Sequence, residues 1–99
     1  MITLDMIPSP NPAVVSRVIK DEAVLVLPAR GQVKVLNEVG ARIWSLVDGK
    51  RTVGNIIATI EAEYAVSAEV ALNDTSFFLD QLANREIISF SQGVKAART

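Results

Sequence analysis

The chain has 99 residues, 49% of them hydrophobic, so it is long enough for one apolar core and too short for a second domain of ordinary size. Its 10 basic and 11 acidic residues give a formal net charge of −1, which argues against a nucleic-acid or anionic-membrane partner. Cys and His are both absent, which excludes disulfides, thiolate and imidazole metal sites, and Cys nucleophiles. We therefore expect a protein without catalytic activity, metal or cofactor.

The N-terminal segment, residues 1–12, has proline at positions 8, 10 and 12. Each proline disfavours helical geometry at the residue before it, so we expect an extended N-terminal arm. The segment has no basic stretch followed by an apolar core, and the apolar run at residues 23–27 is far shorter than the ~20 residues of a membrane span. We therefore expect a cytoplasmic protein with no membrane partner.

Three β-type runs follow the arm. Residues 13–20 are rich in β-branched side chains, and residues 23–27 form a second such run that Pro28 stops. Gly31 allows a turn, after which residues 32–36 alternate polar and apolar side chains like a half-exposed strand. These features predict a three-stranded antiparallel sheet.

Three helices are predicted after the sheet, each preceded by a capping residue. Asn37 caps a helix that ends at Asp48-Gly49, and Thr52 caps residues 53–64. Ser67 or a neighbouring residue starts the third helix, at residues 68–85. Trp44 lies beside the first apolar stripe, at the edge of the core or in a protein contact. The side chains expected in the core recur at helical spacing and are Val39, Ile43, Leu46 and Val47, then Val53, Ile56, Ile57, Ile60 and Tyr64, then Ala71, Thr75, Phe78, Leu79 and Leu82.

The order of strands and helices predicts an α+β fold that resembles a winged helix-turn-helix, with a single domain at residues 13–90. Residues 87–90 suggest a short closing strand. Residues 91–99 are polar and small, so we expect a flexible tail there.

A winged helix can bind DNA, which gives one alternative hypothesis, a DNA-binding regulator. A DNA-reading helix needs Arg, Lys, Asn or Gln side chains that reach phosphates and base edges. The third helix instead carries Glu69, Asp74 and Asp80 against Arg85, so its charge opposes the phosphate backbone. A second alternative is a structural subunit that stabilises an enzyme through Trp44 or the apolar face of the sheet.

The third strand and the third helix form the candidate binding site. Residues 32–36 carry one charge, that of Lys34, and no proline, so an exposed edge here would accept an added strand. On the helix, two successive rings cannot point inward equally; Phe78 fits the apolar stripe, which leaves Phe77 on a flank with Asn73, Asp74 and Gln81. The alternatives are that a wide core takes both rings and that the strand is central or covered by the arm.

Several runs carry a family resemblance. They are Val24-Leu25-Val26-Leu27-Pro28, then Val35-Leu36-Asn37-Glu38-Val39-Gly40-Ala41-Arg42-Ile43-Trp44, then Leu46-Val47-Asp48-Gly49-Lys50-Arg51-Thr52-Val53, followed by Ile56, Tyr64, Asp74, Phe78-Leu79 and Leu82. Over about residues 13–90 the chain thereby resembles the PqqD-like family.

The resemblance implies a recognition element of ribosomally synthesised, post-translationally modified peptide (RiPP) pathways. Such a domain binds the leader of a precursor peptide as a strand added to the third β-strand, beside the third helix. It presents the peptide to a modifying enzyme or a leader peptidase. On this chain the implied peptide-binding residues are Gln32, Val33, Lys34, Val35, Leu36, Asn73, Asp74, Phe77, Phe78, Gln81 and Arg85.

Family members of this length include a peptide chaperone of quinone-cofactor (PQQ) biosynthesis that serves a radical enzyme, and the leader-binding subunit of lasso peptide systems. The form Val-Gly-Ala-Arg-Ile-Trp at residues 39–44 is more similar to the lasso type. The resemblance implies no catalytic residue. An exposed edge that accepts a peptide can also pair with itself, so a homodimer is an open alternative.

Overall fold

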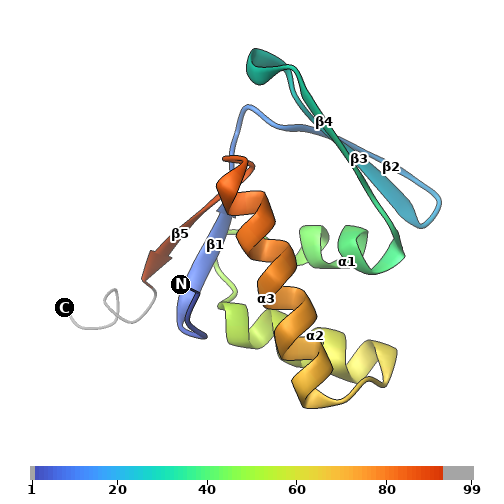
Figure 1. The fold of residues 1–99 in the computed structure, drawn as a ribbon, viewed down its shortest axis with the longest axis vertical. Coiled ribbons are helices and arrows are strands. Elements are labelled where there is room, and N and C mark those ends of the chain that lie inside the picture. The colour runs from blue at the N-terminus through green and yellow to red at the C-terminus, as the bar shows by residue number, and fades with distance from the viewer. Residues whose placement is uncertain (1, 93–99) are drawn as a thin grey trace.

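The computed structural model describes residues 2–92 and confirms an α+β fold, with a three-stranded antiparallel sheet followed by three helices (Figure 1). A two-stranded sheet is built from segments near the two ends of the described chain. In chain order the elements are β1 Met6–Pro10, β2 Val15–Ile19, β3 Glu22–Leu27, the short 3₁₀ turn η1 Pro28–Arg30, β4 Gln32–Leu36, α1 Glu38–Leu46, α2 Val53–Tyr64, α3 Ala68–Asn84 and β5 Ile88–Gln92.

The larger sheet has the strand order β2-β3-β4, so within residues 2–92 β4 is an edge strand with one side unpaired. Leu27 pairs with Gln32 and Ala23 with Leu36, which fixes the register of the β3–β4 hairpin. Gly31 closes the turn between them at a φ of 63°, in the left-handed region where a side chain is disfavoured. The N-terminal arm does not cover this edge, because it pairs elsewhere.

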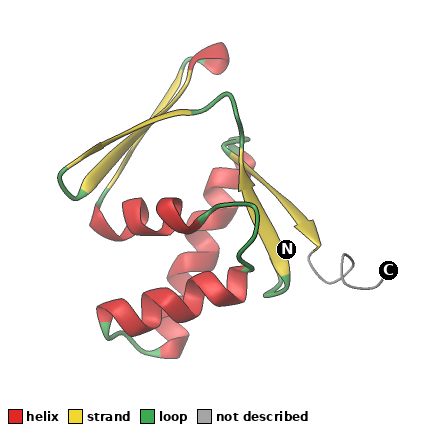
Figure 2. Cartoon of the chain, turned by 180° about the vertical axis from the view of Figure 1, so that it is seen from behind, coloured by secondary structure: helices red, strands yellow, loops and turns green. Residues whose placement is uncertain are grey.

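The smaller sheet joins β1 to β5 in an antiparallel pair, with Pro8 opposite Phe90. Figure 2 shows this pair beside the helices and separate from the larger sheet. β1 contains Pro8 and Pro10, which lack an N–H group and are tolerated because a two-stranded sheet has only edge strands. The expected arm is therefore extended where it forms β1. Of the expected tail, Ser91 and Gln92 lie in β5, and residues 93–99 are outside the described residues.

All three helices begin at the predicted capping residues. The Asn37 side chain accepts a hydrogen bond from the Gly40 N–H at 2.9 Å, and the Thr52 and Ser67 hydroxyls accept from the third residue of their own helices. Each cap satisfies one of the backbone donors that a helix start leaves without a partner. After α1, the chain turns through Gly49 at a φ of 77°.

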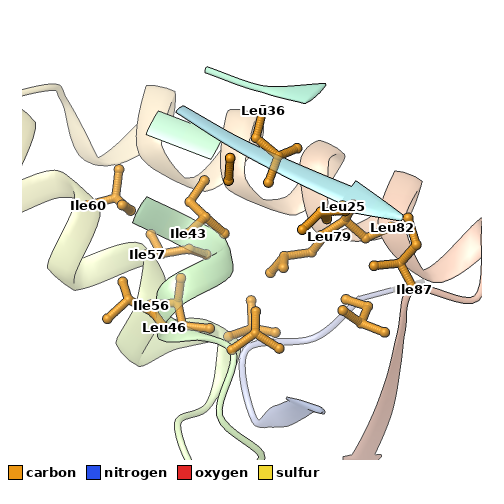
Figure 3. Packing of buried hydrophobic residues seen from close by; sticks show 14 of the residues in the cluster. Leu25, Leu36, Ile43, Leu46, Ile56, Ile57, Ile60, Leu79, Leu82 and Ile87 are labelled. Atoms are coloured by element: carbon orange, nitrogen blue, oxygen red, sulfur yellow. The ribbon is translucent and has the colours of Figure 1, made fainter. Parts of the chain in front are cut away.

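The core lies between the inner face of the larger sheet and the three helices (Figure 3). The sheet contributes Leu25 and Leu36, and each helix contributes the buried side of its predicted apolar stripe. Trp44 packs against the core while partly exposed, as the core-edge interpretation predicts. The prediction that Val39 lies in the core is wrong, because this residue, in the first turn of α1, is exposed and lines a groove beside the core.

An ion pair on the surface joins α1 to α2. The guanidinium of Arg42 donates to both carboxylate oxygens of Glu63, at 2.8 and 2.7 Å. This hydrogen bonding lowers the pKa of the Glu63 carboxyl and raises the pKa of Arg42, so both groups stay charged around neutrality. The pair links two helices whose residues also line the groove between β4 and α3.

Replacement of a core leucine tests this packing. Leu79→Ala should lower the free energy of unfolding by about 2–5 kcal/mol, because Leu79 is fully buried and its truncation leaves a cavity. Leu72→Ala on the same helix, where the side chain is 41% exposed, should cost less than about 1 kcal/mol. Chemical denaturation measures both values, and equal losses in the two variants would contradict the arrangement.

Candidate functional site

An open groove of about 460 Å³ runs between the edge strand β4 and helix α3. The second half of β4 and the first turns of α1 form one wall, and the first half of α3 forms the other. The end of α2 and the loop after it close the groove at one end. Its lining residues are Lys34, Val35, Leu36, Asn37, Val39, Gly40, Ile43, Ile60, Tyr64, Val66, Val70, Ala71, Asp74, Thr75 and Phe78.

The direct passage from β4 into α1 creates the first wall. Leu36 is buried, Asn37 caps the helix immediately after it, and Gly40 lies one turn further on. A Cβ placed on Gly40 would lie 3.4 Å from the Leu36 Cβ and 3.4 Å from the Phe78 Cε1. The small residue thus lets the Phe78 ring of α3 approach the junction closely, and larger side chains there would move the ring.

The lining is mostly apolar and partly open to solvent. Val39 and Val70 are exposed, and Tyr64, Val66 and Phe78 are half-buried. When a ligand covers apolar side chains in a concave site, the burial favours binding by about 25 cal/mol per Å² of apolar surface removed from water. The groove therefore suits a ligand that presents apolar side chains.

Two charged side chains line the groove, Lys34 on β4 and Asp74 on α3. Neither forms an ion pair within residues 2–92. At the end of the groove, desolvation raises the pKa of Tyr64, and the negative charges of Glu38 and Glu63 raise it further. The phenol is consequently protonated at neutral pH and can donate a hydrogen bond.

Two buried polar atoms in the described part of the chain lack a hydrogen-bond partner, and they lie on the two elements that flank the groove. One is the hydroxyl oxygen of Thr75 on α3, a side chain that is 1% exposed and lines the groove. The other is Oε1 of Gln32, on the inner face of β4. A buried hydroxyl without a hydrogen-bond partner lowers the free energy of unfolding by about 1–3 kcal/mol. A purely structural role therefore does not account for a hydroxyl at this position.

The structure brings some of the sequence-predicted site residues together and separates others. Lys34, Val35, Leu36, Asp74 and Phe78 line the groove. Phe77 is 65% exposed and lies on another surface of α3, beside Ile2 and Asp80. The remaining predicted residues continue along the same two elements or just beyond them without lining the groove; they are Gln32, Val33, Asn73, Gln81 and Arg85.

One part of the groove, which Tyr64, Val66 and Val70 line, is not among the residues predicted from the sequence. Tyr64 and Ala71 were both predicted to lie in the core because they belong to apolar stripes. Such a stripe identifies the face of a helix that points inward, but it does not show which residues of that face line a groove that is open to solvent. One signal was available: Val70 lies outside the stripe of α3, and an apolar residue off the stripe is a candidate for contact with a ligand.

Within residues 2–92, no cluster of acidic side chains has the arrangement of a metal site. None of the helices within residues 2–92 has both the length and the apolar composition that a membrane span requires. The groove between β4 and α3 combines an apolar lining with polar groups.

The chain resembles known proteins in both sequence and fold. Residues 22–88 match the family described as Coenzyme PQQ synthesis protein D (PqqD), a range that contains β3, β4 and all three helices. The chain is also similar to a solved structure of TbiB1 in complex with the TbiA(beta) leader peptide, with 39% sequence identity and a TM-score of 0.74 over 82% of this chain and 94% of that chain. No curated protein matches the chain.

The unpartnered hydroxyl gives a test of the groove floor. Thr75→Val keeps the shape of the side chain and removes the buried oxygen, so it should raise the free energy of unfolding by about 1 kcal/mol. Thermal and chemical denaturation measure the change. A loss of more than about 1 kcal/mol would show instead that the hydroxyl bonds a backbone carbonyl of the preceding helical turn.

Proposed function

Because the chain belongs to the PqqD family, as a PqqD-like RiPP recognition element, we propose that it is a non-catalytic adaptor that binds the leader of a ribosomally synthesised precursor peptide. The leader lies along β4 and in the groove beside α3. The adaptor then presents the rest of the precursor to a modifying enzyme or a leader peptidase. One observation carries the proposal: an unpaired strand edge borders an apolar groove.

Strand addition explains why edge and groove occur together. A peptide that pairs with the free side of β4 makes several backbone hydrogen bonds, each worth about 1 kcal/mol net. Its side chains point alternately to the two faces of the sheet, so every second one enters the groove. The backbone bonds supply affinity without regard to sequence, and the lining supplies selection among leaders.

A lasso-type leader peptidase is the partner that we favour, on the form of residues 39–44 in α1. The similarity to TbiB1, whose solved complex contains a leader peptide, supports leader binding in general. The second candidate is a peptide chaperone of the PQQ type for a radical enzyme, which the description of the matching family supports. Binding assays with each class of partner enzyme, in the presence and absence of leader, separate these two.

Two substitutions on α3 test the groove directly. Val70 lines the groove and is 45% exposed, whereas Leu72 lies outside it and is 41% exposed. Val70→Lys should weaken leader binding about tenfold or more, because the peptide would have to cover a long charged side chain in place of an apolar one. Leu72→Lys adds the same charge to the same helix and should leave the affinity unchanged.

Fluorescence anisotropy measures both affinities, with leaders of precursors encoded beside this chain's gene and with the TbiA(beta) leader as probes. Circular dichroism checks that both variants fold. Equal weakening in the two variants, or no binding of any leader by the unmodified chain, would contradict the proposal.

A further inference from the structure

Lys34 is an inward-facing charge on an edge strand. Along β4, the exposed side chains of Val33 and Val35 alternate with Gln32, Lys34 and Leu36, and Leu36 on that inner side is buried in the core. Lys34 is half-buried, lines the groove and has no ion-pair partner among residues 2–92. An inward-pointing charge opposes unwanted strand pairing, because an added strand removes water from it.

The register of a strand paired with β4 determines which peptide side chain faces Lys34. In a paired strand, the residue directly opposite has its side chain on the same face, with the two Cβ atoms about 4.5–5.5 Å apart. The residue opposite Lys34 therefore points into the groove. The neighbour two positions away lies opposite Leu36, where the lining is apolar and includes Ile43 and Phe78.

We propose that the peptide recognised by this chain carries an acidic side chain opposite Lys34, two residues from a large apolar side chain that fills the groove beside Leu36. This inference rests on the proposed function and specifies the class of peptide. A carboxylate at this position pairs with the ammonium as both lose water, whereas a basic side chain meets a like charge directly opposite. Lys34 is thus a specificity-determining residue, and its charge also opposes unwanted strand pairing at the edge of β4.

Asp74 limits where the peptide carboxylate can lie. It lines the opposite wall, on α3, and is exposed, so it repels a carboxylate that approaches α3. The two charges together favour an acidic side chain on the β4 side of the groove. Basic side chains of the peptide are favoured only near α3.

The test is a selection from a displayed library of random short peptides against the full chain, followed by affinities of individual peptides. The unmodified protein should enrich Asp or Glu at one position, two residues from a large apolar residue. For a selected peptide, a Glu-to-Gln change at that position should weaken binding about fivefold. Lys34→Gln should abolish this difference, and Lys34→Glu should instead select Lys or Arg there.

Arg17→Glu is the matched control, because it reverses a charge on β2, outside the groove, and alters net charge as Lys34→Glu does. It should leave the acidic preference intact. Peptides that bind without an acidic preference, or a preference that both reversals change equally, would overturn the role of Lys34 while leaving the proposed function standing. Failure to select any peptide would overturn the proposed function itself. Circular dichroism of each variant, with Lys34→Gln as the milder change, separates these results from misfolding.

Discussion

The passage from β4 into α1 is the constraint on which the rest of the structure depends. Leu36 ends the strand inside the core, and Asn37 caps the helix at the next residue, so the chain changes direction without a loop. Because α1 starts there, it packs against β3, while α2 packs against α1 and α3 packs against α2. Within residues 2–92, β4 is left with an unpaired edge, and a groove lies between it and α3.

A free edge with apolar surroundings carries a risk, since unpaired backbone groups can pair with any extended chain. The outer face of β4 adds to the risk, because Val33 and Val35 are exposed there. The half-buried charge of Lys34 acts in the other direction and makes pairing depend on the incoming sequence. An edge of this kind selects among extended peptides through two opposing effects. Backbone hydrogen bonds favour pairing with any sequence, whereas covering the charge of Lys34 is unfavourable unless the peptide supplies a compensating group.

The sequence predicted the features that depend on neighbouring residues. The structure confirms the three caps at Asn37, Thr52 and Ser67 and the helices after them. They could be predicted because a cap and an apolar stripe depend only on residues close together in the sequence. The edge position of β4 follows from the order of the hairpins but was open to coverage by the arm. That alternative is wrong, since the arm pairs with β5 instead.

Features set by contacts between distant segments were harder to predict. The pairing of β1 with β5 joins Ile7 to Ser91 across almost the whole chain, and no local pattern specifies such a partner. Phe77 and Phe78 differ by one helical step of about 100°, which the stripe alone left ambiguous. The structure places Phe78 in the groove, with its ring close to Gly40, and Phe77 outside it on another surface of α3.

We propose that the leader binds as a strand on the edge of β4 that is unpaired within residues 2–92. Amide hydrogen exchange of the chain with and without bound leader tests it most directly, because exchange reports which backbone N–H groups become hydrogen-bonded. We expect added protection in residues 32–36, whereas exchange in β2, the other edge of the same sheet, should be unchanged. Protection on β2 in place of β4, or leader binding that leaves the amides of β4 as exposed as before, would contradict it.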